Sequence, residues 1–321
     1  MRGQCPQTDR AIGAPTRLSR WLVRNTYPTR YHTLRDLNYQ LKQLGDANRD
    51  GSFATHAKRA YLLSQIADQL HALGYRRMQA RSLKAKHVEA LVEHWQAQHL
   101  SAGTIKNRMA ALRWWARRVG KHSVIAKDND HYGIERRRYS ATRSKAETLG
   151  TDALARVRDT HTAFSLRLQA AFGLRREEAI KFRVGYADRG SHLRLKASWT
   201  KGGKAREIPI RTMAQRQLLD EIRAAVGNAS LIPASRSYVQ QLRVYVRHVM
   251  NAGLSRMHGL RHAYAQDRYQ SLTGFACPVA GGPNAVSLTE AERRLDQAAR
   301  CTISVELGHE REQITTIYLG R

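Results

Sequence analysis

The chain has 321 residues, a length that suits two domains of ordinary size, and it carries 55 Lys and Arg against 26 Asp and Glu, a net charge of +29. Such an excess makes a compact protein repel itself unless it meets a polyanion, and nucleic acid is the usual one. Short apolar windows, the lack of a signal-peptide pattern and three widely spaced cysteines exclude a membrane-spanning, secreted or disulfide-stapled protein, so we expect a cytoplasmic, nucleoid-associated one.

The first stretch of the chain shows neither a helical nor a strand period. Residues 1–31 contain six arginines and three prolines, and we interpret them as a basic N-terminal arm. The basicity continues beyond this arm, because residues 1–120 carry 21 Lys and Arg against 7 Asp and Glu, a net charge of +14, and the other 201 residues carry +15. Both halves of the chain are therefore expected to contact phosphates.

Residues 32–120 predict a helical domain that binds DNA. Apolar residues recur at helical spacing over 56–73, 83–99 and 101–119, which predicts three helices. Gly74 and Gly120 follow the first and third of these runs, where a glycine commonly ends a helix.

The third of these helices carries two stripes. Ile105 and Met109 belong to its apolar stripe, whereas Lys106, Arg113 and Arg117 stand at i, i+7 and i+11 on another side. A helix that is apolar on one side and basic on another suits a core docked on a DNA backbone. The alternative is an ordinary solvated face, and the charge of the whole domain favours DNA contact.

No metal site is expected in this chain. Residues 46–51 open like a calcium loop, but the twelfth position is Ala57 rather than the Glu that would close the cage. We interpret this stretch as a polar turn.

Residues 121–147 are charged and irregular, and we interpret them as a basic interdomain linker. Arg136 and Arg137 lie in it as candidate DNA-binding residues, although a simple flexible tether is the alternative. Residues 148–321 alternate helical and strand patterns: 153–172 predicts a helix, and the runs 192–200 and 205–210 around Gly202-Gly203 predict a β-hairpin. The predicted fold class is mainly α with a small antiparallel β-sheet, an α+β arrangement.

The second half of the chain contains the residue types that phosphodiester cleavage without a metal requires. That reaction needs a nucleophile, fixed cations around the phosphate, and groups that accept and donate protons. The candidates occur in the order Arg175 and Glu178 after a helical run, Lys201 at the hairpin tip, His258 and Arg261, His309, and finally Tyr318. No cofactor is implied.

These ordered motifs resemble the tyrosine recombinase, or phage-type integrase, family. The family's signature consists of an Arg in a GLRxxE motif, a hairpin Lys, an HxxR motif, an LGH motif and a Tyr nine residues after that His. The matching positions are Arg175, Glu178, Lys201, His258, Arg261, His309 and Tyr318. The resemblance covers residues 32–321 and implies a helical core-binding domain followed by a catalytic domain at 148–321.

The resemblance also implies a role for each cation. Arg175 and Arg261 would each present a planar guanidinium to the non-bridging phosphate oxygens. Lys201 would protonate the departing 5′-oxygen, with Lys204 as its near rival. Tyr318 would be the nucleophile, forming a 3′-phosphotyrosyl link that stores the energy for resealing.

The remaining residues of the set are expected to assist. His258 can accept or hold a proton near the nucleophile, and His309 can hydrogen-bond a non-bridging oxygen. Glu178, three residues after Arg175 on one helical face, would orient the site without touching DNA. His262 is interpreted as a structural histidine that points to another side of its helix.

Two features depart from the family pattern. The 48 residues from Arg261 to His309 are more than the family usually has, which predicts an insertion near 269–300 with a loop followed by a helix at 288–299. It could contact DNA or a neighbouring protomer, or merely be tolerated. The sequence also stops three residues after Tyr318, so the exchange of a C-terminal segment between subunits is expected to be absent or to use another element.

The sequence thus predicts a site-specific DNA recombinase that integrates or excises a mobile genetic element. Its expected partners are double-stranded DNA with paired recognition sites, three further copies of itself in a homo-tetramer that clamps two duplexes, and DNA-bending accessory proteins; no membrane partner is expected. The alternatives are a nicking-closing enzyme like a type IB topoisomerase, a non-catalytic DNA-binding regulator on the same fold and, third, an RNA-associated basic protein.

Overall fold

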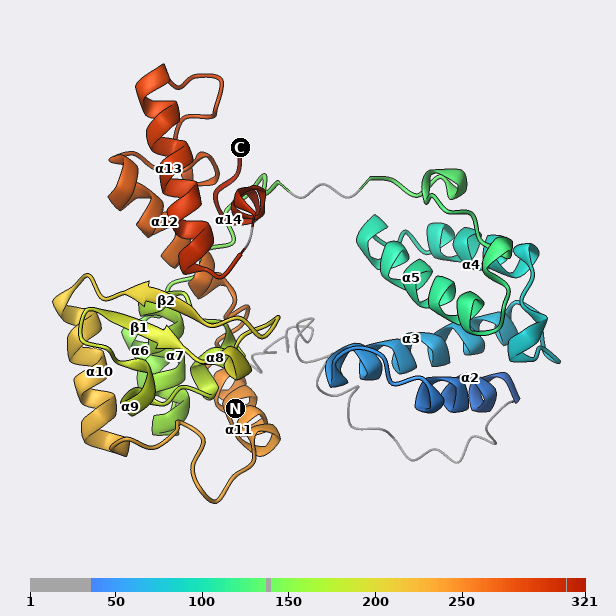
Figure 1. Cartoon of the computed structure of the whole chain (residues 1–321), viewed down its shortest axis with the longest axis horizontal. Helices are drawn as coiled ribbons and strands as arrows, with labels where there is room; N and C mark the ends of the chain where they lie inside the picture. The colour runs from blue at the N-terminus through green and yellow to red at the C-terminus, as the bar shows by residue number, and fades with distance from the viewer. Residues whose placement is uncertain (1–35, 137–139, 310) are drawn as a thin grey trace, which may run out of the picture. The chain divides into compact units, whose positions relative to one another are not determined.

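The computed structural model describes residues 36–136, 140–309 and 311–321. Their contacts divide them into two compact units, a helical unit over residues 36–136 and a second unit over the described residues from 140 to 321 (Figure 1). The predicted arm at 1–31 and the candidate Arg137 lie outside the described residues. In the described part of the chain, no helix is long and apolar enough to cross a membrane.

The described residues of the helical unit form four α-helices and three short 3₁₀ turns. The helices are α2 (Asp36–Ala47), α3 (Phe53–Ala72), α4 (Ala85–Ala97) and α5 (Ala102–Arg118), and the turns are η1 (Ala80–Ser82), η2 (His122–Val124) and η3 (Asp130–Tyr132). Ser52 and Ser101 begin α3 and α5 by accepting hydrogen bonds from the backbone N–H three residues on, which satisfies a donor that a helix start leaves open.

Two tryptophans dominate the core of this unit. Trp95 and Trp115 are fully buried, and each indole N–H donates a hydrogen bond, to the Gln69 side chain at 2.9 Å and to the Ala80 carbonyl at 2.9 Å. Part of the segment predicted as a linker belongs to the same core, because Ile125 and Ile134 are buried in it.

The first part of the second unit consists of short and medium-length helices around one hairpin. Its elements are α6 (Thr151–Ala155), α7 (Thr160–Phe172), α8 (Arg176–Ile180), α9 (Val184–Ala187), β1 (His192–Leu195), η4 (Ala197–Trp199), β2 (Arg206–Pro209), α10 (Met213–Val226) and α11 (Tyr238–Asn251). The strands pair antiparallel with His192 opposite Pro209 and Leu195 opposite Arg206.

The chain then forms the elements that carry the last motifs. They are α12 (Gly259–Thr273), η5 (Pro278–Ala280), α13 (Glu290–Glu306), η6 (Glu312–Thr315) and α14 (Thr316–Leu319). Figure 1 shows α14 beside α12 and α13 within this unit.

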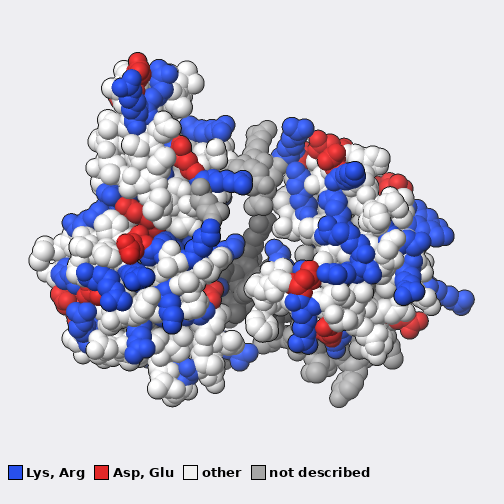
Figure 2. All heavy atoms as spheres, in the orientation of Figure 1, with Lys and Arg blue, Asp and Glu red and all other residues white. Residues whose placement is uncertain are grey.

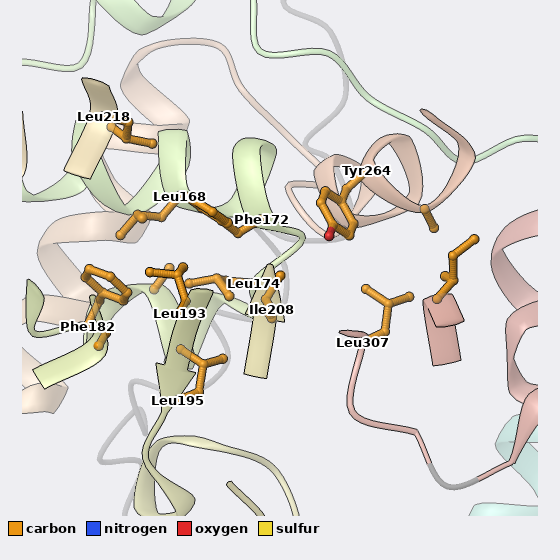
Figure 3. Close-up of a cluster of buried hydrophobic side chains, with 14 of the residues drawn as sticks. Leu168, Phe172, Leu174, Phe182, Leu193, Leu195, Ile208, Leu218, Tyr264 and Leu307 are labelled. Atoms are coloured by element: carbon orange, nitrogen blue, oxygen red, sulfur yellow. The ribbon is translucent and has the colours of Figure 1, made fainter. Parts of the chain in front are cut away.

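One hydrophobic cluster joins the hairpin to these C-terminal elements. Figure 3 shows Leu193 and Ile208 from the two strands facing Phe172 of α7, with Tyr264 and Leu307 beyond them. Tyr318 and Leu319 of α14 belong to the same cluster. The C-terminal helix is therefore seated in the core of the unit, and α11 packs on the other side of α7 in a separate cluster with Leu166.

Residues 141–147 lie along the elements of the last motifs. The Ala141 N–H donates to the Thr316 carbonyl at 2.9 Å, and the Glu147 N–H donates to the Gly259 carbonyl at 3.1 Å. The end of the predicted linker is thus attached to the start of α12 and to the start of α14.

The predicted fold class is confirmed: the protein is mainly helical with one small antiparallel sheet. The prediction of one continuous helix over 153–172 is wrong, because Asp159 interrupts it and caps α7 by accepting from the Thr162 N–H at 2.8 Å. The hairpin forms, but its strands are shorter than predicted since η4 replaces the end of the first. Helix α2 was not predicted.

Candidate active site

One cleft in the second unit gathers most of the predicted catalytic side chains. It has a volume of about 1190 Å³ and is bounded by the hairpin tip, the start of α8, the residue before α12 and the segment after α13. The predicted residues along its wall are Arg175, Lys201, His258, His309 and Tyr318. Five separated stretches of the sequence thus reach one open hollow.

The hydroxyl of Tyr318 lies between a guanidinium and an imidazole. Arg261 Nε donates a hydrogen bond to this oxygen at 3.3 Å, and His309 Nε2 lies 3.3 Å from the same oxygen. The Tyr318 side chain is 4% exposed, so these two groups and the cleft determine what the oxygen meets.

Arg261 lies beneath the cleft rather than along its wall. It is 1% exposed, and its Nη1 and Nη2 donate to the backbone carbonyls of Gly173, at 2.5 Å, and Leu307. Burial lowers the pKa of Arg261 to about 10, so the guanidinium keeps its charge at neutral pH. In this structure the Arg261 guanidinium faces the tyrosine hydroxyl and does not present an open fork to the cleft.

Glu178 holds Arg175 in place. Arg175 precedes α8, and Glu178 accepts from its Nη1 at 2.9 Å and from its backbone N–H at 2.7 Å. The Glu178 side chain is fully buried, whereas 19% of the Arg175 side chain stays exposed to the cleft. The carboxylate is enclosed and the arginine is not, so Glu178 can hold Arg175 without itself reaching the cleft.

Arg206 is a further member of this site and lies outside the motifs named above. It is 9% exposed, its Nη1 and Nη2 each lie 2.7 Å from the Glu178 carboxylate, and its Nε donates to the Glu306 carbonyl at 3.0 Å. Burial alone would raise the pKa of Glu178, but the hydrogen bonds and charge of Arg206 outweigh it and, with Arg175, lower this pKa to about 2. The signal was available: Arg206 alternates with the exposed Glu207, which places it on the buried face with Ile208.

The tyrosine ring is surrounded by three histidines. The centroid of the Tyr318 ring lies 5.8 Å from that of His309 and 6.2 Å from that of His258. Burial, together with the charges of Arg261 and Arg175, lowers the pKa of His309 to about 4. Burial and the same two arginines also lower the pKa of His258. His309 is therefore neutral at pH 7, and one of its ring nitrogens can accept a hydrogen bond.

His262 is the third of these histidines, and its predicted position is wrong. It was expected to point to another side of the helix, but its ring centroid lies 4.6 Å from that of Tyr318 and 5.5 Å from that of His258. The side chain is 4% exposed, and burial lowers its pKa to about 4. Because α14 packs against the first turn of α12, one helical step is not enough to turn His262 away from the tyrosine.

Both lysines of the hairpin tip line the cleft. Lys201 and Lys204 flank the two glycines of the turn, and the Thr200 hydroxyl closes this turn by donating to the Lys204 carbonyl at 2.6 Å. The choice of Lys201 over Lys204 stays a prediction.

The predicted DNA-binding residues of the helical unit differ in their environment. Arg117 is exposed and Lys106 is half-buried, whereas the half-buried Arg113 donates to the Ala126 carbonyl at 3.0 Å. Arg136 is 88% exposed and lies 3.2 Å from Asp130. Figure 2 shows basic side chains over much of the visible face of each unit, with fewer acidic ones among them.

Two sequence models of known families match this chain. The model described as "Phage integrase, N-terminal" matches residues 34–125, and the model described as "Integrase" matches residues 135–267. Together they cover more than half of the chain. The comparison with curated proteins found no match.

Several solved structures have a similar fold at low sequence identity. A lambda integrase (75–356) dimer bound to a COC′ core site has a TM-score of 0.55 and 15% identity, covering 88% of this chain and 94% of that one. XerH site-specific recombinase bound to palindromic difH substrate gives 0.54 and 18%, covering 88% and 81%. The Tn1549 transposon integrase in complex with circular intermediate DNA gives 0.51 and 14%, covering 89% and 95%.

Proposed function

The chain belongs to the tyrosine recombinase, or phage-type integrase, family, and on that basis we propose that it cuts and rejoins DNA strands through Tyr318. The phenol oxygen attacks a backbone phosphorus, a 3′-phosphotyrosyl bond forms, and the 5′-oxygen leaves as a hydroxyl. Attack by a 5′-hydroxyl on the phosphotyrosyl bond then restores the backbone and releases the tyrosine, so no external energy source is consumed.

The observation that carries this proposal is the position of the Tyr318 oxygen, 3.3 Å from both Arg261 Nε and His309 Nε2. A neutral His309 can accept the hydrogen of the phenol, while Arg261 donates to the oxygen and favours negative charge on it. Arg175, held by Glu178, keeps part of its guanidinium in the cleft, where a phosphate would meet it.

The other residues act on the phosphate and the leaving group. Fixed cations aimed at a developing negative charge supply a large part of catalysis: Arg175 fills this role at the phosphate, and Arg261, beneath the cleft, supports the charge on the Tyr318 oxygen. Lys201, at the glycine-rich tip of the hairpin, protonates the departing 5′-oxygen. His258 holds a proton close to the tyrosine.

The wider role is recombination between paired DNA sites. Four protomers hold two duplexes, with the helical and catalytic units of each binding one duplex, and exchange strands to integrate or excise a mobile element in the cytoplasm. DNA-bending accessory proteins assist at the sites. The net charge of +29 and the similar fold of a lambda integrase tetramer bound to a Holliday junction support this reading.

A nicked suicide substrate tests the chemistry directly. When cleavage occurs beside the nick, the short strand diffuses away and the protein stays bound to the DNA in an SDS-resistant adduct, which is expected here without magnesium. Tyr318→Phe should abolish the adduct while DNA binding persists, and Tyr186→Phe, a change in the same unit, should not. An adduct formed by Tyr318→Phe would refute the assignment. Relaxation of supercoils without a preferred sequence would instead indicate a nicking-closing enzyme.

A further inference from the structure

The segment between α12 and α13 has no role in the chemistry described so far. It covers residues 274–289, lies inside the predicted insertion, and contains the short turn η5 at Pro278–Ala280. The segment lies beside α14, because its turn η5 contacts that helix directly.

The first part of this segment is a compact turn with one buried residue, Cys277. The N–H groups of Ala280 and Gly282 donate to the Cys277 carbonyl at 2.9 and 3.0 Å, which folds residues 277–282 into a tight turn. Cys277 is 1% exposed and belongs to the same hydrophobic cluster as Tyr318 and Leu319. The insertion thus contributes to the core that surrounds the tyrosine.

The turn touches the chain two residues after the tyrosine. Gly320 has φ +77°, and a Cβ added there would lie 2.7 Å from Val279 Cγ1 and 3.3 Å from Pro278 Cβ. Only a glycine fits this backbone conformation and this space. The end of α14 therefore rests on the turn at 278–279.

Arg300 secures the same point from α13. It is 6% exposed and its Nη1 donates to the Gly320 carbonyl at 3.0 Å, while its Nε binds Asp296 at 2.8 Å. Asp296 in turn accepts from the Tyr269 hydroxyl at 2.5 Å. The contact of its Nε with Asp296 thus fixes the buried guanidinium of Arg300, which holds its Nη1 in place as a donor to Gly320.

A third attachment comes from α12. The Gln266 amide donates to the Tyr318 carbonyl at 3.0 Å, and the Ser144 hydroxyl donates to the Gln266 side-chain oxygen at 3.1 Å. The backbone on both sides of Leu319 is therefore hydrogen-bonded to side chains of the same chain.

We propose that residues 274–282 and Arg300 form a clamp that fixes the Tyr318 segment in the active site of its own subunit. The proposal rests on the proposed function, since it assumes that Tyr318 is the nucleophile. Val279 and Arg300 are then positioning residues: they never reach the DNA, and they act by holding the carbonyl and backbone that follow the tyrosine. The insertion takes its role from this contact.

Two matched pairs of variants test the clamp in the suicide-substrate assay. Arg300→Met removes the donor to Gly320 and should slow adduct formation about tenfold, the effect of losing one charged hydrogen bond. Arg294→Met, in the same helix and also with a carboxylate partner at i−4 but 79% exposed, should leave the rate unchanged. Val279→Ala should slow it about threefold, whereas Val286→Ala, at a position 92% exposed in the same segment, should not.

The rate must fall while DNA binding and the far-ultraviolet circular dichroism stay unchanged. If Arg300→Met does not fold, Val279→Ala decides the question, because it removes only two methyl groups from a half-buried side chain. Rates of Arg300→Met and Val279→Ala equal to those of their controls would overturn the clamp.

A mixing experiment asks in which subunit the tyrosine acts. Tyr318→Phe and Arg175→Ala are each inactive under the proposed function, and their mixture on a paired site should also give no adduct, because the clamp keeps each tyrosine in its own subunit. An adduct from the mixture would overturn the clamp. If the wild-type protein itself gives no adduct, the proposed function fails instead, so the two failures are distinguishable.

Discussion

Replacement of Arg206 by methionine removes the partner that encloses Glu178. In the folded protein both guanidinium nitrogens of Arg206 lie 2.7 Å from the Glu178 carboxylate, and neither side chain is more than 6% exposed. Methionine keeps much of the volume and none of the donors. The carboxylate would retain Arg175, from which it accepts at 2.9 Å and 2.7 Å.

The size of the effect follows from the burial of this pair. Removal of one member of a buried ion pair typically costs about 3–5 kcal/mol because a charge is left uncompensated. The contacts from Arg175 persist, so we expect the free energy of unfolding to fall by about 2–4 kcal/mol. The cleavage rate should fall as well, since Arg175 would become the sole cation partner of Glu178 and would be drawn away from the cleft.

Urea unfolding and the suicide-substrate assay measure the two effects separately. Arg216→Met is the matched control, because Arg216 binds the buried carboxylate of Asp188 at 2.7 Å at a place remote from the cleft. It should lower stability and leave the cleavage rate of the folded protein unchanged. A cleavage rate for Arg206→Met equal to that of Arg216→Met would refute the link between Arg206 and the active site, and an unfolding free energy within about 0.5 kcal/mol of the wild type would refute the ion-pair reasoning.

Three further predictions concern pH, the helical core and DNA binding. Burial lowers the pKa values of His262 and His309 to about 4, so between pH 6.5 and 4 the unfolded chain binds more protons than the folded one, and the free energy of unfolding falls as the pH falls. His262→Gln should remove up to about 3 kcal/mol of this pH dependence, measured by urea unfolding at several pH values. A pH dependence of stability equal to that of the wild type would contradict this prediction. Trp115→Ala should destabilise the helical unit by about 3–5 kcal/mol in calorimetry, because the ring is fully buried. A loss below about 1 kcal/mol would contradict a central role of Trp115 in this core. Arg117→Ala should reduce the salt dependence of DNA binding by about one phosphate contact. Arg113→Ala should mainly lower stability, since its guanidinium is bonded to the backbone. A salt titration in which Arg113→Ala, and not Arg117→Ala, reduces the salt dependence would contradict this prediction.

Helices and strands with a regular apolar pattern could be predicted from the sequence. The stripe Leu63, Ile66 and Leu70 defined α3 to within three residues at its start, and the alternation around Gly202-Gly203 defined a hairpin. The order of the motifs also indicated that Arg175, His309 and other members of the set belong to one site, and these residues line one cleft.

What the sequence left open depends on packing between distant segments. His262 faces the tyrosine because α14 lies against the start of α12, a contact of residues more than 50 positions apart. Arg206 is buried because Glu178, from another element, accepts both of its nitrogens. The break before α7 was missed for a local reason: Asp159 lies in the polar run 158–162, where a capping residue marks a new helix start.

The guanidinium of Arg261 joins three stretches of backbone that are otherwise separate, those at Gly173, Leu307 and Tyr318. An exchange at this position therefore alters two properties at once, the positive charge beneath the cleft and the mutual spacing of three segments. Lysine would preserve the first and forfeit the second, since a single ammonium lacks the planar array of donors. The sensitivity of this enzyme to Arg261→Lys thus measures how much of the arginine's contribution is architectural and how much is electrostatic.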